Sequence, residues 1–236
     1  KASGLILIVE NEDFSWLPEL GPLTANKAFW TSGEEQQIER DLALVRRHQL
    51  HNVFTASRAS VERFAIESTA CWLPEAFDGF LIGRPPQVPL TDRIGLCWND
   101  PQEKTWADEL EWPITCKQRG AIPDVVYDLS GYRIHLKLNL STLVQPPIFE
   151  TLGCGVFLLT NETPDLLKLF TPGEHLATFI GQEDLNDKLN FYTSNHEDRE
   201  RIARQGHEYA RREHTYLRRA EQMVEEMTIR LSLPGV

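Results

Sequence analysis

An apolar run near the middle of the chain, Val156–Leu159, most constrains the fold. It contains no polar residue and is followed by Thr160 and Asn161, a pattern typical of a strand buried on both faces of a parallel sheet. Before it, residues 148–152 predict one short helix, which the segment Gly153-Cys154-Gly155 ends because glycine allows the chain to reverse. We therefore expect a helix followed by a buried strand.

A second helix is predicted directly after this strand. Thr163 is the predicted N-cap, Pro164 suits the first helical position, and Asp165 complements the positive end of the helix dipole. In open α/β sheets, ligands bind beyond the carboxyl ends of the strands, where helix N-termini point. Glu150, on the preceding helix, is expected to face that crevice.

The first half of the chain alternates between predicted strands and helices. Apolar runs predict strands at residues 4–9, 28–30, 52–55 and 70–73, and the first of these is expected to be buried. Helical spacing predicts helices over 38–48, preceded by Ser32 and Glu35 at capping-box spacing, and from Ser57 or Ser60 through Ile66. This alternation predicts a parallel sheet with right-handed crossovers.

A proline-rich segment separates this half from the next. Residues 83–92 read GRPPQVPLTD, with three prolines in ten residues, and predict a linker or hinge. Beyond it, strands are predicted at 93–98, 114–116, 134–140 and 176–180, and helices at 101–110, 184–189 and within 197–227, with a short helix or turn at 124–132. The strand over 134–140 alternates apolar and polar residues, so one of its faces is expected to be partly wet.

These elements predict two Rossmann-like α/β domains with a cleft between them, both shorter than usual. The predicted boundaries are an N-terminal domain at residues 1–84, a linker at 85–92, a C-terminal domain at 93–195, and C-terminal helices at 196–236 that pack back towards the first domain. In these last helices Ile202, Tyr209, Leu217 and Met223 mark the expected buried side.

Charge and cysteine usage exclude several classes of protein. A formal net charge of −11 argues against nonspecific nucleic-acid binding, which depends on neutralising phosphates. The four cysteines, Cys71, Cys97, Cys116 and Cys154, form no CxxC pair, which indicates a reduced, cytoplasmic and metal-free protein. We see no signal-peptide pattern and no run of membrane-spanning length.

Three segments carry a resemblance to a known family. They run from Val53 through Ser60–Phe64 to Trp72–Asp78, from Pro147–Glu150 through Asn161–Leu166 to Glu174, and from Asn195–Ala203 through Gly206 to Tyr216. In this order they resemble the CgeB-like (spore-maturation type) glycosyltransferases, which have the GT-B architecture of two Rossmann domains. They cover a little under half of the chain.

The resemblance implies transfer of a sugar from a nucleotide-sugar, such as a UDP-sugar, to a hydroxyl of a glycan or protein. By position, Glu150 would accept hydrogen bonds from the ribose hydroxyls, and amides near Gly153, Gly155 and Thr163 would face donor oxygens. No metal and no further cofactor are implied. The remaining candidates for the nucleotide site are Asp165, Trp98, Asn99 and Lys104.

Departures from the family pattern support a second hypothesis. Thr142 stands where related families have a glutamate, Pro147 where an arginine is common, and Trp98-Asn99 where a glycine turn meets the diphosphate. Lys104, Lys117, Arg119 and Lys137 are the candidate cations. The alternative is a catalytically lapsed scaffolding subunit of a glycosylation complex. A nucleotide-binding oxidoreductase is a third hypothesis, disfavoured because no GxGxxG follows Val9 or Trp98.

Simpler structural interpretations of the same residues stay open. Glu150 is also compatible with an ordinary exposed carboxylate, Gly153 and Gly155 with helix termination, and Asp165 with a dipole partner. His135 is a candidate base near neutral pH, or a histidine on the wet face of its strand.

Overall fold

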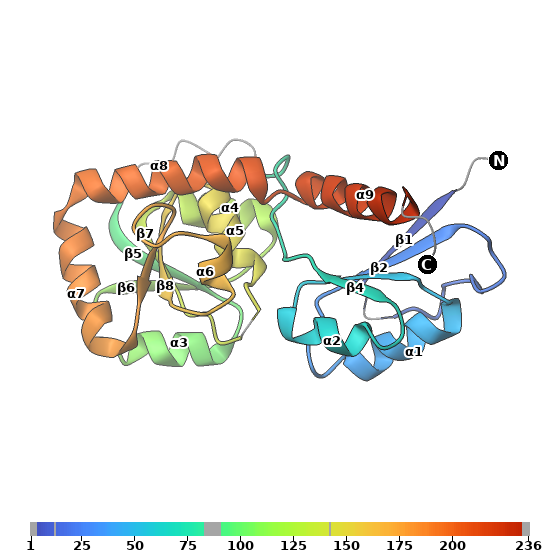
Figure 1. Ribbon diagram of the computed structural model, residues 1–236. Coiled ribbons are helices and arrows are strands. Elements are labelled where there is room, and N and C mark those ends of the chain that lie inside the picture. The colour runs from blue at the N-terminus through green and yellow to red at the C-terminus, as the bar shows by residue number, and fades with distance from the viewer. Residues whose placement is uncertain (1–3, 12, 83–90, 142, 233–236) are drawn as a thin grey trace. The chain divides into compact units, whose positions relative to one another are not determined.

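The structure is a computed structural model that describes residues 4–11, 13–82, 91–141 and 143–232, and it divides into two compact units (Figure 1). Unit 1 comprises Lys1–Glu75 and Glu221–Val236, and unit 2 comprises Ala76–Ala220. Most of the predicted linker, and Thr142, lie outside the described residues. The boundaries predicted from the sequence remain a prediction.

Unit 1 contains a parallel four-stranded sheet whose strands follow one another in chain order. Its strands are β1 (Leu5–Val9), β2 (Asn26–Thr31), β3 (Asn52–Thr55) and β4 (Thr69–Trp72), and its helices are α1 (Ile38–His48), η1 (Arg58–Ser60) and α2 (Val61–Phe64). Helices α1 and α2 pack their apolar side chains on one face of the sheet. Helix α9 (Tyr216–Ser232) begins in unit 2 and ends in unit 1, where Met223 and Met227 pack on the other face.

Unit 2 contains a parallel five-stranded sheet in the order β6-β5-β7-β8-β9. The strands are β5 (Thr91–Trp98), β6 (Ile114–Gln118), β7 (Tyr132–Lys137), β8 (Phe157–Asn161) and β9 (Ala177–Phe179). The helices are α3 (Pro101–Asp108), α4 (Ile122–Ser130), α5 (Pro146–Gly153), α6 (Leu166–Leu169), α7 (Gly181–Ser194) and α8 (His196–Glu213). Helix α3 begins at Pro101 as predicted, and Asp100 caps it, because its carboxylate accepts from the Gln102 amide at 2.9 Å.

Helices cover both faces of this sheet. One apolar cluster joins α4 and α5 to the strands, and a second joins α7 and the region of α3 to the opposite face (Figure 1). The central strands are therefore enclosed on both sides, as the apolar run at 156–159 predicts. The prediction of parallel α/β sheets is confirmed in both units.

The prediction of one partly wet face on the strand at 134–140 is wrong. Strand β7 ends at Lys137, and the side chains of His135 and Lys137 are only 1 % and 0 % exposed. The alternation therefore does not separate core from solvent, because α5 and its neighbours cover the face on which the polar side chains lie. These polar groups must find partners inside the fold.

The expectation that the first strand is buried is also wrong. Leu5, Leu7 and Val9 are 49 %, 43 % and 53 % exposed. Strand β1 lies at the edge of its sheet, and the cluster formed by Met223 and Met227 includes residues of β2 and β3 but none of the described residues of β1. These apolar side chains are therefore about half exposed at the edge of the sheet.

Two smaller expectations also differ from the structure. Helix α1 begins at Ile38 after Gln37, without a side-chain cap, so Ser32 and Glu35 form no capping box. In the helical segment predicted at 197–227, which α8 and α9 form, Leu217 is exposed instead of buried. Ile202 and Met223 are buried as predicted.

One glycine of α8 sets how closely this helix approaches its neighbours. A Cβ atom on Gly206 would lie 2.0 Å from the backbone oxygen of His175 and 3.1 Å from a methyl group of Leu152. Because a backbone oxygen cannot move without shifting its chain segment, only glycine fits this contact.

Replacing Gly206 with alanine is expected to lower the free energy of unfolding by about 1–3 kcal/mol, because the added methyl group overpacks the contact. Helix propensity alone predicts that the same substitution raises the free energy of unfolding by about 0.5–1 kcal/mol, because alanine favours the helix more than glycine does. Chemical denaturation measures the difference, with Glu208→Ala, exposed on the same helix, as the control. An increase in stability for Gly206→Ala would contradict the packing argument.

Candidate functional site

In the sheet of unit 2, the chain connections that follow β5 lead to strands on opposite sides of it. From β5 the chain passes to β6 on one side of it and later to β7 on the other side. In doubly wound sheets, ligands bind at such a switch point, beyond the carboxyl ends of the strands. Here those ends are Trp98 on β5 and Lys137 on β7, so the residues around them form the candidate site.

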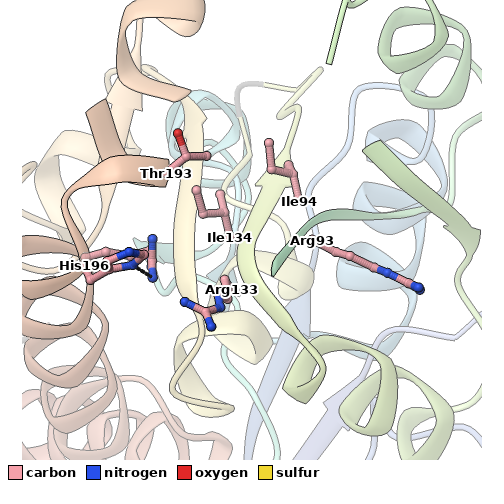
Figure 2. Close-up of a pocket in the computed structure, with 7 residues that line it drawn as sticks. Arg93, Ile94, Arg133, Ile134, Thr193 and His196 are labelled. Atoms are coloured by element: carbon pink, nitrogen blue, oxygen red, sulfur yellow. Dashed lines mark hydrogen bonds between the residues drawn. The ribbon is translucent and has the colours of Figure 1, made fainter. Parts of the chain in front are cut away.

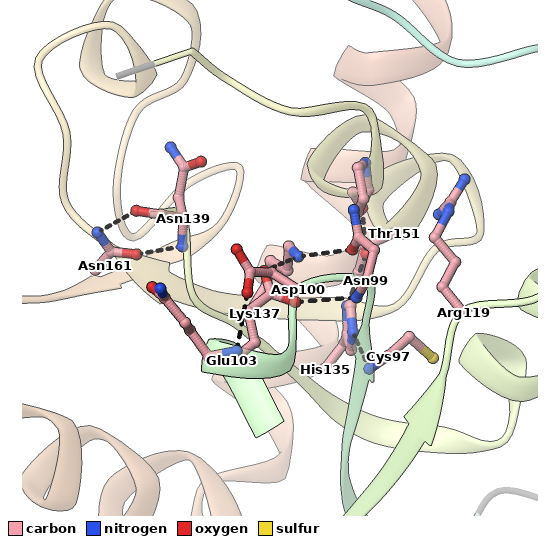
Figure 3. A network of polar contacts seen from close by, with 12 residues as sticks. Cys97, Asn99, Asp100, Glu103, Arg119, His135, Lys137, Asn139, Thr151 and Asn161 are labelled. Atoms are coloured by element: carbon pink, nitrogen blue, oxygen red, sulfur yellow. Dashed lines mark hydrogen bonds and ion pairs between the residues drawn. The ribbon is translucent and has the colours of Figure 1, made fainter. Parts of the chain in front are cut away.

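A buried ion pair lies directly at this point (Figure 3). The Lys137 ammonium pairs with the Glu103 carboxylate of α3, and the two side chains are 0 % and 2 % exposed. Lys137 also donates to the side-chain Oδ1 of Asn99 at 3.3 Å, and the backbone N–H of Asn99 donates to Glu103 Oε2 at 3.3 Å. Burial lowers the pKa of Lys137, and the hydrogen bond that Lys137 donates to Glu103 opposes this change. The pair thereby joins the end of β7 to the turn after β5.

Two asparagines connect the ends of β7 and β8. The Asn139 amide N–H donates to Asn161 Oδ1 at 2.6 Å, and Asn161 Nδ2 donates to the Asn139 carbonyl at 3.1 Å. The Asn139 side chain itself is only 4 % exposed, and neither its Nδ2 nor its Oδ1 has a hydrogen-bond partner. In Figure 3 it points away from Asn161. An unpaired buried amide costs about 1–3 kcal/mol, so this group indicates a missing polar partner.

Glu150 is buried and held by an arginine. Its carboxylate oxygens contact both terminal nitrogens of Arg119, and Nη2 lies 2.7 Å from Oε1. Arg119 directly follows β6, and the hydrogen bond to Glu150 raises its pKa. The side chain of Glu150 is 5 % exposed, so the reading as an ordinary exposed carboxylate is wrong. The pair brings the first helical turns of α5 to the end of β6.

His135 lies inside the fold. Its Nε2 accepts from the Cys97 amide at 3.2 Å, and its Nδ1 lies 2.8 Å from Thr151 Oγ1. Because the Thr151 hydroxyl donates to the Pro147 carbonyl at 2.7 Å, it accepts from His135, and the proton resides on Nδ1. Burial, together with nearby Lys137, lowers the pKa of His135 to about 3. Both ring nitrogens of His135 are therefore occupied, and the ring is neutral. This geometry favours a structural role, in which His135 holds α5, and it disfavours a role as a catalytic base, which would need an available nitrogen.

Thr163 and Asp165 follow the carboxyl end of β8, on the same edge of the sheet as Asn99 and Lys137. The Thr163 hydroxyl accepts from the Leu166 amide at 3.4 Å, and helix α6 begins at Leu166, slightly later than predicted. Trp98 is half-buried at the end of β5. These residues therefore remain candidates by position.

Gly153 and Gly155 lie at the opposite edge of the sheet, because α5 runs back before β8 begins. The Gly155 amide donates to the Leu152 carbonyl at 2.9 Å, and its φ of 73° is left-handed. A Cβ on Gly153 would lie 2.6 Å from the Phe77 ring. Both glycines end the helix and allow close packing, and the structure does not bring them to the candidate site.

The other candidate cations lie on the surface. Lys104 pairs with Asp108 one turn further along α3, and Lys117 pairs with Asp128. Of the four cations named from the sequence, Arg119 and Lys137 reach the carboxyl edge of the sheet. Among the described residues, no group of three or more His, Cys, Asp or Glu could hold a metal ion.

Sequence reasoning missed Glu103, Asn139 and Asn161. Two of them share a visible signal: the strand runs that contain Leu136–Leu138 and Leu158–Thr160 are each followed directly by an asparagine. Glu103 stands three positions after the N-cap Asp100, which suggests capping and gives no hint of a lysine partner 34 residues away.

Replacing Lys137 with methionine is expected to lower the free energy of unfolding by about 3–5 kcal/mol, because it leaves a buried carboxylate unpaired. The double variant Lys137→Met/Glu103→Leu should recover most of this loss. Lys104→Met, which breaks a surface pair, is the control and should change stability by less than about 1 kcal/mol. Denaturant unfolding measures these free energies. If Lys137→Met and Lys104→Met lowered the free energy of unfolding equally, burial would not explain the cost of breaking the Lys137–Glu103 pair.

The lowered pKa of His135 also predicts a dependence of stability on pH. Between its ordinary pKa of 6.5 and the folded value of about 3, the unfolded chain binds the proton more readily, so stability falls as the pH falls. One such group contributes at most about 1.4 kcal/mol per pH unit. His135→Gln should therefore show a shallower slope between pH 6.5 and pH 4 than the wild type. Equal slopes would show that the ring is not held neutral.

Solved structures with similar folds include several glycosyltransferases. The UDP complex of HepE (Alr3699) from Anabaena has a TM-score of 0.66 at 13 % identity, over 86 % of this chain and 72 % of that one. An alpha-glucosyltransferase with UDP-glucose and abasic-site DNA has a TM-score of 0.66 at 9 % identity, over 95 % and 80 %. A glycosyltransferase from Rickettsia africae has a TM-score of 0.57 at 9 % identity, over 98 % and 100 %.

These likenesses show that the two parallel sheets have the fold of GT-B glycosyltransferases. No curated protein sequence is significantly similar to this chain. In the part of the chain that the structure describes, no helix is long and apolar enough to cross a membrane. The family model described as glycosyl transferase-like matches residues 91–225, more than half of the 236 residues. The chain therefore belongs to the glycosyl transferase-like family.

Proposed function

We propose that this chain is a glycosyltransferase that binds a UDP-sugar at the carboxyl edge of the five-stranded sheet. The observation that carries the proposal is the buried, unpaired amide of Asn139 at the end of β7, next to the switch point of the sheet. Membership of the family supports a sugar transfer, and the UDP found in similar structures supports this donor nucleotide.

Asn139 has the chemistry that a uridine nucleotide requires. A side-chain amide offers two donors on Nδ2 and an acceptor on Oδ1. A hydroxyl-bearing ribose and the imide edge of uracil each donate one hydrogen bond and accept another, so either could satisfy both ends of this group. Binding would remove the cost of the unpaired amide and would thereby add to affinity.

We assign Glu150 to the ribose hydroxyls. A carboxylate has about four lone-pair sites, and Arg119 uses one on each oxygen. The remaining sites can accept from two vicinal hydroxyls, while the paired arginine holds the carboxylate in one orientation. Arg119 is thus a positioning residue, and we expect Trp98, Asn99, Thr163 and Asp165 to border the nucleotide.

In the proposed reaction, a hydroxyl oxygen of a glycan or protein bonds to the anomeric carbon of the donor. The bond between that carbon and the diphosphate oxygen breaks, UDP leaves with the bonding electrons, and the hydroxyl proton passes to a base or to solvent. Stabilisation of the leaving diphosphate by protein groups instead of a metal ion is part of the proposal. The CgeB-like subgroup and hexosyl transfer are proposed on the sequence resemblance alone.

The alternative is a lapsed, scaffolding member of the family. The pairs Lys137–Glu103 and Arg119–Glu150 each have zero net charge, so the two cations at this edge are already neutralised. Together with Pro147 and Trp98 at positions where the family has other residues, this balance favours the alternative. A scaffold would not be stabilised by UDP.

Saturating UDP is expected to stabilise the wild type, by about 2.7 kcal/mol at one hundred times the dissociation constant. Asn139→Ala should weaken UDP binding about tenfold or more, because the ligand loses its buried partner. Calorimetric and thermal-shift titrations measure both effects, and UMP and uridine show which part of the nucleotide Asn139 contacts.

Asn190→Ala, the same substitution at an exposed position of α7, is the matched control and should leave UDP binding unchanged. Glu150→Gln should also weaken binding and should do so for uridine as well as for UDP. If the wild type responds to none of the uridine, guanosine, cytidine or thymidine diphosphates at millimolar concentration, the enzyme proposal fails and the scaffold is preferred.

A further inference from the structure

A network of polar side chains lies at the carboxyl edge of the four-stranded sheet in unit 1. Thr31 ends β2, Glu10 directly follows β1, and Asp41 lies in the first turn of α1. The side chain of Asp41 is 0 % exposed, and that of Glu10 is 18 % exposed. All three residues belong to unit 1, so this network shares no residue with the nucleotide site proposed in unit 2.

The two carboxylates share two partners. Arg40 Nη2 donates to Glu10 Oε1 at 3.0 Å and to Asp41 Oδ1 at 2.9 Å. On the other side, Thr31 Oγ1 lies 2.6 Å from Asp41 Oδ2 and 3.2 Å from Glu10 Oε2. The four side chains therefore form a closed ring in which one arginine faces two acids.

The Thr31 hydroxyl cannot satisfy both carboxylates while both are ionised. A hydroxyl has one proton to donate and two lone pairs, and an ionised carboxylate can only accept. One lone pair of Thr31 Oγ1 accepts from the Gly33 amide at 3.0 Å. If the hydroxyl donates to Asp41, its remaining lone pair faces the carboxylate of Glu10. The ring then carries two negative charges and one positive charge, and it lacks one hydrogen bond.

One additional proton completes the ring. A protonated Asp41 donates to Thr31 Oγ1, and 2.6 Å is an ordinary distance for an O–H···O hydrogen bond. The Thr31 hydroxyl then donates to Glu10, so its proton and both of its lone pairs are used. The ring also becomes neutral, with one charge of each sign.

Asp41 is the acid that takes this proton. It is fully buried, whereas Glu10 Oε2 already accepts from the Ser32 amide. The charged groups that face Asp41 are Arg40 on its own helix and Glu10 at the end of β1. Burial raises the pKa of Asp41 above its ordinary value of 3.8, and Glu10 adds to this change, while the hydrogen bonds from Thr31 and Arg40 oppose it.

We propose that Asp41 is a proton-binding site and that the ring is a pH-sensitive switch between β1, β2 and α1. When Asp41 takes one proton from solvent, the Thr31 hydroxyl turns from Asp41 to Glu10 and the ring closes. When the proton leaves at higher pH, the bond between Thr31 and Glu10 is lost. The turn after β2 responds, because the amides of Ser32 and Gly33 donate into the ring. The inference does not depend on the proposed donor site.

An NMR titration of the full wild-type chain tests the proposal directly. The chemical shift of the Asp41 carboxyl carbon should titrate with a midpoint above the ordinary value of 3.8. A midpoint at or below that value would overturn the proposal. This measurement requires no variant, so it does not depend on whether a substituted chain folds.

Hydrogen exchange of the Ser32 and Gly33 amides, corrected for the intrinsic effect of pH on exchange, measures the closing of the ring. Between the raised pKa of Asp41 and its ordinary value, the closed ring binds the proton more readily than the opened one. Protection should therefore rise as the pH falls through this range, by at most about tenfold per pH unit for one proton. Protection that falls with the pH would overturn the proposal.

Asp41→Asn imitates the protonated acid, because an amide offers an oxygen to Arg40 and a permanent N–H donor to Thr31. Its Ser32 and Gly33 amides should be as protected at neutral pH as those of the wild type at low pH, without the pH dependence. Asp108→Asn, the same change in a surface ion pair of α3, should behave as the wild type does. If Asp41→Asn instead lowered the protection at neutral pH, Asp41 would be an ordinary ionised partner of Arg40, and the proposal would fail.

Discussion

The fully buried ion pair between Lys137 and Glu103 is the constraint on which the rest of the candidate site depends. Neither charge can be hydrated where it lies, so each requires the other, and the pair fixes the distance between the end of β7 and the first turn of α3. The turn that contains Asn99 is held by the same two groups. A binding site needs such a rigid edge, because a mobile turn would lose ordering entropy each time a ligand bound.

Helix α5 is oriented by two adjacent residues that contact different strands. Glu150 pairs with Arg119 after β6, and Thr151 accepts from His135 on β7. The role of the neutral His135 is structural: its hydrogen bond to Thr151 sets the rotation of α5 about the helix axis. That rotation determines whether the carboxylate of Glu150 lies over the edge of the sheet. The candidate ribose-binding group therefore depends on a buried hydrogen bond one residue away.

The two ends of the five-stranded sheet differ in their electrostatics. At the carboxyl edge, two cations are each balanced by a carboxylate, and the buried groups without a hydrogen-bond partner, the Asn139 amide and the Thr160 hydroxyl, are neutral. Towards the amino end, arginines and a histidine gather around a cavity without an acid among the described lining residues (Figure 2). The first environment suits a ligand recognised by hydrogen bonds. One sheet thus offers two chemically distinct surfaces.

Neighbouring residues are enough to specify the local elements. The apolar run at 156–159, the strands at 52–55 and 93–98, and the helix that begins at residue 101 follow from neighbouring residues, and the structure contains them. The helix–strand pattern placed Glu150 at the crevice, and the family resemblance supplied its expected ribose-binding role. The sequence could not show that Lys137 and His135 are buried or that Leu5 and Leu7 are exposed, because burial depends on which helices cover which face. The pairs Arg119–Glu150 and Lys137–Glu103 join residues 31 and 34 positions apart. These contacts form only in the folded chain, because they depend on the order in which the strands assemble and not on any local pattern.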